Sequence, residues 1–289
     1  MIKTNITLPE DKAMYLKTSD IQRFTENLRY EEKSEATRDK YLRDIRSFQH
    51  YIANRDITKV EVMSYKEYLK SRYAPASVNS MLVALNGFLR FLGLEGCCVK
   101  LLKVQQQIFC REDKELTRRE YQRLIRAAGN TRISYIIQTI CGTGIRVSEL
   151  QYITAEAVRL GRTIVDCKNK TRVIFIPTSV QSLLKKYMKK HGISNGSVFV
   201  SKNGKPIDRS SIWRQMKALC HQADVVMNKV FPHNLRHLFA RTFYSLEKDV
   251  VRLADLLGHS SVNTTRIYIM DTGRQHISQL DRVQAILRT

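Results

Sequence analysis

The amino-acid sequence predicts a mainly α-helical protein with a small β-hairpin, divided into two units. Apolar residues recur at intervals of three and four along most of the chain, which is the spacing of amphipathic helices. Two short β-rich runs, 162–167 and 171–176, flank a Lys-Asn-Lys turn, which is typical of a hairpin. Residues 1–113 carry a net charge of +4 and residues 114–289 a net charge of +18, which indicates two units with different roles.

The first unit, residues 1–96, is expected to be a bundle of short helices. Apolar periodicity places these helices, in chain order, at 20–30, 36–53, 60–71 and after Pro75, with Ser77 as a candidate cap of the last. Beyond Gly93 the helical period is broken, and the segment 97–113 is interpreted as a linker.

The second unit, residues 114–289, is expected to combine helices with the hairpin. Thr117 and Glu120 have the spacing of a capping box and mark the start of its first helix. The other elements are predicted, in chain order, as helices at 131–141 and 147–152, the hairpin, a short strand at 197–201, and helices at 211–223, 232–246, 250–257 and 261–268. The tail, 271–289, has an amphipathic pattern. Each unit is long enough to bury its own core.

The composition excludes several classes of protein. The chain has 49 basic and 27 acidic residues, a formal net charge of +22, and its 43% hydrophobic content indicates a folded protein rather than a disordered one. Apolar runs are too short for a transmembrane helix, and the N-terminus lacks the apolar core of a secretory signal. The charge predicts a polyanionic partner, with nucleic acid favoured over a membrane surface. The six cysteines lack metal-binding spacing, so we expect reduced thiols in a cytosolic protein.

A histidine and an arginine three residues apart lie near the start of a predicted helix in the second unit. His233 and Arg236 share one face there, where free backbone N–H groups and the helix dipole favour anions. An ordinary amphipathic helix with a solvated arginine would show the same pattern. A zinc protease site is excluded, because Asn234 stands where the HExxH motif requires glutamate.

Three further features lie before and after this pair. A glycine-rich turn precedes Arg146 and would present it to an incoming anion. A helix that ends at Gly258 would expose His259 just beyond it. Tyr268 follows between two isoleucines, and by itself it would be interpreted as a buried aromatic residue with a hydrogen-bonded hydroxyl.

Together, these features resemble the tyrosine recombinase or phage integrase family, which includes Xer and mobile-element recombinases. The order and context of the motifs carry the resemblance, which covers the second unit, and the helical first unit is similar to the core-binding domain of the family. The resemblance implies a two-domain architecture, with a DNA-binding core-binding domain at 1–96, a linker at 97–113 and a mixed α/β catalytic domain with a C-terminal tail at 114–289.

The resemblance implies a catalytic role for each matched residue. Arg146 matches the first arginine of the family, His233 and Arg236 match its HxxR pair, His259 matches its second histidine, and Tyr268 matches its nucleophile. The tyrosine hydroxyl would attack the scissile phosphate, and the two guanidinium groups would bind the non-bridging oxygens as these gain charge. The first histidine would take part in proton transfer, and the second would donate a hydrogen bond to the phosphate.

The family also has a lysine in a hairpin turn, which protonates the departing 5′ oxygen. Lys168 is the best match for it, and Lys170 is the alternative. Glu149 is similar to an acidic residue that supports the site, and His237 is a second candidate for a supporting role. Because a 3′-phosphotyrosine link keeps the energy of the broken diester, rejoining needs no ATP, and neither a metal nor another cofactor is expected.

The partners and the biological role are also implied by the resemblance. We expect double-stranded DNA with specific recombination sites, a homo-tetramer on two such sites, and a tail that docks on a neighbouring protomer rather than on its own domain. Accessory DNA-bending or directionality proteins fit this role, no membrane is expected, and the expected location is the cytoplasm, in association with the nucleoid. Integration, excision or inversion of a mobile DNA segment is favoured. The alternatives are Xer-type chromosome-dimer resolution, a nicking and closing enzyme, and a non-catalytic DNA-binding protein of the same fold.

Overall fold

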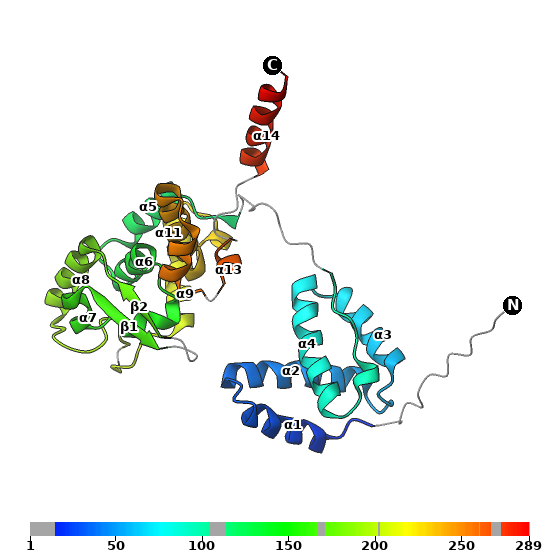
Figure 1. Cartoon of the computed structure of the whole chain (residues 1–289). Coiled ribbons are helices and arrows are strands. Elements are labelled where there is room, and N and C mark those ends of the chain that lie inside the picture. Colours follow the sequence, from blue (N-terminus) through cyan, green and yellow to red (C-terminus); the bar gives the residue numbers. More distant parts are fainter. Residues whose placement is uncertain are drawn as a thin grey trace. The chain divides into compact units, whose positions relative to one another are not determined.

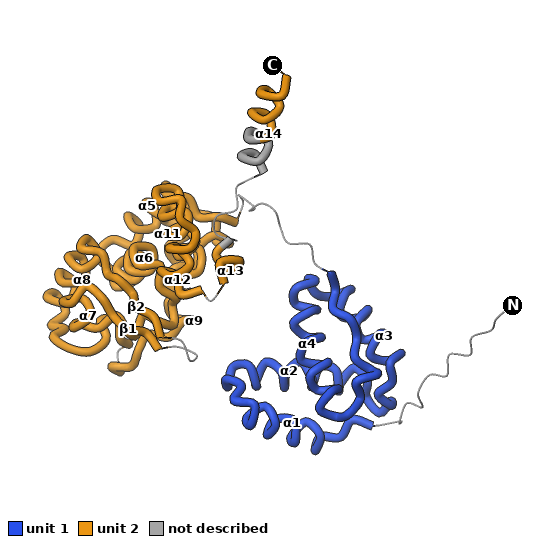
Figure 2. The backbone as a smooth tube through the Cα atoms, in the orientation of Figure 1, with its two compact units in different colours: residues 1–106 blue, residues 107–289 orange. Residues whose placement is uncertain are grey.

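The computed structural model describes residues 15–103, 114–166, 171–201, 203–259, 261–266 and 273–288. The chain forms two compact units, residues 1–106 and 107–289 (Figure 2). Nearly all of the regular structure in the described residues is helical, and the sheet they form is a two-stranded hairpin (Figure 1). No described helix combines the length and the hydropathy that a bilayer span requires.

The helices of the first unit are α1 (Thr18–Tyr30), α2 (Glu35–Ile52), α3 (Lys59–Lys70), α4 (Pro75–Phe91) and the short 3-10 helix η1 (Glu95–Cys97). α2 packs on α1 and α4, and α3 packs on α4, around fully buried side chains such as Phe48, Leu82 and Leu89. The predicted cap of α4, Ser77, is wrong. The helix begins at Pro75, because proline fits the first helical position, where its missing N–H is not needed.

The segment that follows η1 stays on the first unit. The Asn86 side chain donates to the Val99 carbonyl at 2.8 Å and accepts from the Val99 N–H at 3.0 Å. The Asn79 side chain holds Leu102 in the same way, at 2.9 and 2.7 Å. Residues 97–102, at the start of the segment interpreted as a linker, therefore lie against this unit, because two asparagine side chains satisfy the extended backbone as a neighbouring strand would.

The second unit contains, in chain order, α5 (Arg118–Ala128), α6 (Arg132–Thr143), the 3-10 helix η3 (Val147–Tyr152), α7 (Ala155–Leu160), β1 (Arg162–Asp166), β2 (Thr171–Phe175), α8 (Thr178–His191), α9 (Arg209–Ala218), α10 (Cys220–Ala223), the 3-10 helix η4 (Met227–Lys229), α11 (Pro232–Glu247), α12 (Val250–Leu257), α13 (Val262–Arg266) and α14 (Gly273–Leu287). Thr117 and Glu120 form the predicted capping box of α5. The segment 197–201, predicted as a strand, forms only two isolated bridges, in which Ser197 pairs with Thr154 and Val200 pairs with Pro206. A strand needs consecutive paired residues, and here each pairing involves a single residue.

The hairpin turns one face toward the core of the second unit. β1 and β2 pair antiparallel, with Val165 opposite Arg172. Val165 and Ile174 are buried. Because alternate residues of a strand share a face, Arg172 lies on the same side as Ile174 and points inward as well. The hairpin therefore carries a charged side chain on its core-facing side.

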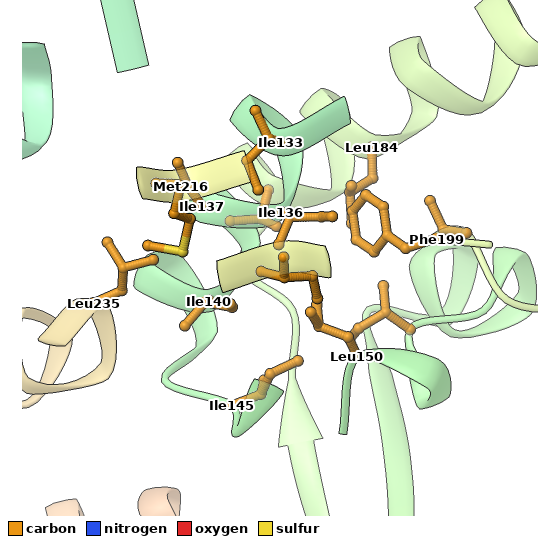
Figure 3. Packing of buried hydrophobic residues seen from close by; sticks show 14 of the residues in the cluster. Ile133, Ile136, Ile137, Ile140, Ile145, Leu150, Leu184, Phe199, Met216 and Leu235 are labelled. Carbon is orange, nitrogen blue, oxygen red and sulfur yellow. The ribbon is translucent and has the colours of Figure 1, made fainter. Parts of the chain in front are cut away.

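Helix α6 supplies the centre of the core of the second unit. Its Ile136, Ile137 and Ile140 are fully buried. Figure 3 shows side chains from other elements packed around them, among them Leu150, Leu184, Phe199, Met216 and Leu235. α11 packs along α6, and a smaller buried cluster joins α11 to α12: Ala240, Leu253 and Leu257. This packing fixes the start of α11 and the end of α12, where most of the described site residues lie.

Candidate active site

One pocket of the second unit brings together four of the predicted site residues: Arg146, His233, Arg236 and His259. Its volume is about 420 Å³. The four residues come from the start of η3, the start of α11 and the segment after α12, so the pocket lies where element ends meet. Polar and cationic side chains from distant parts of the sequence thus converge on one concave surface.

Arg146 directly precedes η3 and is held by Glu149. The buried Glu149 carboxylate accepts hydrogen bonds from the Arg146 backbone N–H at 2.8 Å and from its guanidinium Nη1 at 2.9 Å. Before it, Gly144 has a φ of 65°, and a Cβ there would lie 2.4 Å from the Phe239 ring, so the turn requires glycine. Burial acts to raise the pKa of Glu149, but its hydrogen bonds to Arg146 and Arg172 outweigh burial and lower the pKa. The carboxylate is therefore charged.

Arg236, near the start of α11, is only 2% exposed. Its Nη1 donates to the Gly144 carbonyl at 2.5 Å, and its Nη2 donates to the Leu257 carbonyl at 2.6 Å. The same Nη2 lies 3.1 Å from Nε2 of His259. The alternative interpretation of the HxxR pair, a solvated arginine on an ordinary helix, is therefore wrong.

Three guanidinium groups meet at the C-terminal end of α12. Arg172, Arg236 and Arg146 donate to the consecutive carbonyls of residues 256–258, at 2.6, 2.6 and 3.2 Å in that order. The last carbonyls of a helix have no partner within the helix, and they form the negative end of its dipole. The backbone carbonyls at the end of α12 therefore hold three guanidinium groups close together.

His259 follows Gly258, which ends α12 with a φ of 63°, as predicted. Its Nδ1 lies 2.8 Å from the Thr265 hydroxyl. A guanidinium can only donate, so Nε2 of His259 accepts from Arg236 and Nδ1 carries the ring proton. Burial, followed by the charges of Arg236 and Arg146, lowers the pKa of His259 to about 4. The ring is therefore neutral at pH 7.

His233 borders the pocket, and His237 lies one turn further along α11. Their ring centroids are 4.6 Å apart and the rings meet edge to face. Burial, followed by the charges of Arg236 and Arg146, lowers the pKa of His233. Burial and the neighbouring His233 lower the pKa of His237 to about 4. Both rings are therefore neutral at pH 7, and His233 can accept a proton there.

These shifts predict how the stability of the second unit depends on pH. His237 and His259 bind protons near pH 6.5 in the unfolded chain, but only near pH 4 in the folded one. Between these values the unfolded chain binds more protons, so the free energy of unfolding falls as the pH decreases from 6.5 to 4. We expect calorimetry to show a falling melting temperature over this interval and a smaller fall for His237→Gln. An equally steep fall in the variant would contradict the shift of His237.

Lys168, Lys170 and Tyr268 lie outside the described residues, so their places in the site stay predictions. Within the described ranges, no group of three or more His, Cys, Asp or Glu side chains is arranged to hold a metal ion. What the described residues provide is a set of cations and neutral histidines suited to an anionic ligand.

The motifs did not predict Arg172, Arg209 or Trp213. Arg209 and Trp213 line the pocket from α9, and their spacing of four residues on an amphipathic helix was the available signal. For Arg172 the signal was strand alternation, which puts it on the same face as buried Ile174. A buried charge needs a partner, but the sequence does not say which one.

Comparison with known proteins decides the family. Residues 114–274 match the phage integrase family, and residues 21–96 match the N-terminal SAM-like domain of phage integrases. The chain belongs to the phage integrase family. The predicted fold class, mainly helical with a small sheet and with an N-terminal helical domain before a catalytic domain, is confirmed by these matches and by the structure.

Relatives support this family, and solved structures support the fold. Tyrosine recombinase XerD from Halalkalibacterium halodurans is 29% identical over 79% of this chain and 84% of its own, and tyrosine recombinase XerA from Thermococcus kodakarensis is 30% identical over 69% and 72%. A crystal structure of XerA recombinase is 26% identical, covers 94% of this chain and 98% of its own, and has a TM-score of 0.51. A lambda integrase dimer bound to a COC′ core site is 20% identical over 90% and 97%, with a TM-score of 0.73. The predictions of a tyrosine recombinase and of site-specific DNA recombination are confirmed.

Proposed function

We propose that this recombinase cleaves and rejoins double-stranded DNA at specific sites through a 3′-phosphotyrosine intermediate, with Tyr268 as the nucleophile. The observation that supports it is the convergence of Arg146, Arg236, His233 and His259 on one pocket. Two guanidinium groups and two neutral imidazoles match the negative oxygens and the proton transfers of a phosphodiester reaction. The first unit would bind DNA as the core-binding domain, and the second would be the catalytic domain.

The two arginines stabilise the phosphate as it becomes pentavalent. Arg236 is fixed by two backbone carbonyls, and Arg146 is fixed by Glu149 and by the Gly258 carbonyl. Groups that are already held in place need little rearrangement when charge develops on the non-bridging oxygens. The Arg146 side chain is 41% exposed, so it remains accessible to DNA.

His259 can become a donor to the phosphate without taking up a proton. In the described state its Nε2 accepts from Arg236, and its Nδ1–H donates to Thr265. A phosphate bound to Arg236 would displace the imidazole Nε2. Because a threonine hydroxyl can also donate, Thr265 can then donate to Nδ1, and the ring proton moves to Nε2 and points at the phosphate.

The cleavage step moves two protons. The tyrosine O–H bond breaks as its oxygen forms a bond to phosphorus, and neutral His233 accepts the proton. The bond from phosphorus to the 5′ oxygen breaks, and Lys168 or Lys170 protonates that oxygen. Attack by a 5′-hydroxyl on the phosphotyrosine runs the same steps in reverse and reseals a strand. Comparing Lys168→Ala with Lys170→Ala in the assay below decides between the two lysines.

The test needs a DNA site, which selection from a random duplex library by the full chain supplies. A nick beside the cleavage position then lets the short 5′-hydroxyl fragment diffuse away, which traps the covalent adduct. We expect an adduct that survives denaturation and that peptide mapping locates at Tyr268. An adduct on a different residue, or cleavage without any adduct, would contradict the proposed chemistry.

For the biological role, we propose integration, excision or inversion of a DNA segment. The identity to XerD and XerA proteins favours chromosome-dimer resolution as a second candidate. The selected site distinguishes the two, since paired copies that bracket a DNA segment fit the first role and one copy per chromosome fits the second. Dependence of recombination on cell extract would reveal accessory DNA-bending or directionality proteins.

We also propose that α14 docks on a neighbouring protomer in a tetramer on two DNA sites. Leu280, Val283 and Leu287 follow helical spacing, and each exposes more than half of its surface. The second unit offers a groove of about 650 Å³ on α5, α6 and α11. The apolar side chains that line it include Tyr121, Leu238, Phe239, Phe243 and Leu246. An apolar helix face and an apolar groove on the same chain suit exchange between copies.

Removal of residues 273–289 is therefore expected to prevent assembly on paired sites while one site is still bound. The apolar face of the helix supplies the contact between protomers, so Leu280→Glu with Leu287→Glu should have the same effect. Analytical ultracentrifugation of the DNA complexes measures the number of protomers. Ala285→Glu, at an exposed position nearly opposite the apolar face on the same helix, is the control. An unchanged four-protomer complex after truncation would contradict docking in trans.

A further inference from the structure

Arg172 of β2 links the hairpin to two other elements of the second unit. Its Nη2 donates to Oε2 of Glu149 at 2.5 Å, and its Nη1 donates to the Leu256 carbonyl at 2.6 Å. Glu149 is the carboxylate that holds Arg146, and Leu256 lies three residues before His259. One guanidinium therefore contacts both the carboxylate that holds Arg146 and the helix end that precedes His259.

The Arg172 side chain is enclosed along its length. It is 12% exposed, and its Nε is buried without a hydrogen-bond partner among the described residues. Its aliphatic part passes Gly258, where a Cβ would lie 2.2 Å from Cδ of Arg172. Gly258 thus meets two needs, the positive φ that ends α12 and the space through which the arginine reaches its acceptors.

The two contacts require an arginine. The guanidinium is a rigid fork whose donors reach acceptors on two different elements at once, whereas a lysine presents one ammonium group at the end of a flexible chain. Glu149 is 1% exposed, so its charge depends on the hydrogen bonds it accepts. Without Arg172, Oε2 of Glu149 would keep only the Arg146 backbone N–H as a donor, and its remaining lone pair could draw in a second N–H of the Arg146 guanidinium, in competition with the phosphate.

We propose that Arg172 is a positioning residue of the recombination reaction. It occupies Oε2 of Glu149, which limits the pairing of this carboxylate with the Arg146 guanidinium to Oε1 and leaves the other guanidinium donors available to the scissile phosphate. It also anchors the end of α12, from which His259 follows. It acts through these residues and does not touch the reacting atoms. This inference rests on the proposed function.

The test is a double-variant cycle with Arg172→Ala and Arg146→Ala in the full chain. The substrate carries sulfur in place of the bridging 5′ oxygen at the cleavage position. A thiol leaves as an anion near neutral pH, with an ordinary pKa of about 8.5, so protonation by the hairpin lysine no longer affects the rate. The readout is the single-turnover rate of covalent adduct formation at saturating protein, with the dissociation constant for DNA measured separately.

We expect Arg172→Ala to lower this rate by about 10- to 100-fold, which is the size typical of removing a group that orients a reacting side chain. In the Arg146→Ala background the same change should lower the rate by a clearly smaller factor, because the route through Glu149 and Arg146 is then closed and only the contact with the end of α12 remains. Arg172→Lys, which keeps the charge and one contact, should lie between wild type and Arg172→Ala. The dissociation constant for DNA should stay within about threefold of wild type, since exposed cations provide most of the free energy of DNA binding.

Two results would overturn the inference. If the rate of the double variant fell by the product of the two single-variant factors, Arg172 would not act through Arg146. A wild-type rate for Arg172→Ala on the sulfur substrate, together with a slow rate on the oxygen substrate, would assign its role to the lysine turn. Arg162→Ala, on the exposed face of the same hairpin, is the matched control and should keep the wild-type rate.

Separate readouts cover misfolding and failure of the proposed function. A lowered melting temperature alone cannot produce the non-additive cycle, because a general loss of folding would reduce the rate in both backgrounds. An adduct formed by Tyr268→Phe would refute the proposed nucleophile, whatever the outcome of the cycle. A cycle that multiplies while Tyr268→Phe forms no adduct would refute only the role of Arg172.

Discussion

Replacing Tyr268 with phenylalanine is expected to abolish the covalent protein–DNA adduct and leave DNA binding intact. The change removes the one oxygen proposed to bond to phosphorus, and a phenyl ring cannot replace it, so the loss should be complete rather than partial. The cations that would bind the DNA backbone are all retained, and the dissociation constant should change by less than about threefold. Denaturing gels of the nicked-substrate reaction measure the adduct, and gel shifts under native conditions measure binding.

The matched control for this experiment is Tyr244→Phe. Tyr244 is a half-buried tyrosine of α11, with the Lys248 ammonium 5.3 Å from its ring centroid, and it lies outside the pocket. This variant should form the adduct at the wild-type rate. If instead Tyr268→Phe formed the adduct and Tyr244→Phe did not, the nucleophile would be misassigned even though the family is established.

Local rules were sufficient to predict most of the helices. The apolar stripe of α6 lies where its three- and four-residue spacing placed it, and the Thr117–Glu120 capping box starts α5 as expected. Where two local rules compete, the outcome depends on which is stronger. At α4 the proline at position 75 fixed the helix start, and Ser77 lies inside the helix.

The sequence predicted residues of the site but not the hydrogen-bond partners that hold them in place. Motif order identified Arg146, Arg236 and His259, which the structure places around one pocket. The partners of Arg236 are backbone carbonyls 92 and 21 residues away in the chain. Every residue has a backbone carbonyl, so the amino-acid sequence does not indicate which one accepts the hydrogen bond. The acceptor of Arg172 at Leu256 lies 84 residues away, so strand alternation could indicate burial of the arginine without naming its partner. Tertiary packing alone decides such pairs.

The second large effect is expected for Arg236→Ala, in activity and in stability. Loss of a preorganised donor to the developing phosphate charge should lower the cleavage rate by about 10²- to 10³-fold or more. The same change leaves the carbonyls of Gly144 and Leu257 without their donor and empties the space of a large buried side chain. Together these losses should reduce the free energy of unfolding of the second unit by roughly 2 to 4 kcal/mol. Urea unfolding and single-turnover cleavage measure the two effects separately.

Arg146→Ala is the comparison that separates these two roles. Its side chain is 41% exposed and makes one hydrogen bond to the end of α12. Without it the buried Glu149 still accepts from Arg172 and from the backbone N–H of residue 146, so a similar loss of rate should come with a smaller loss of stability. Arg236→Lys should recover part of the stability but little of the rate, because an ammonium cannot span two carbonyls and still present a fork to the phosphate. Equal losses of stability in Arg236→Ala and Arg146→Ala would mean that the carbonyls at Gly144 and Leu257 do not fix the buried guanidinium. In that case the preorganisation ascribed to the end of α12 would have no energetic basis.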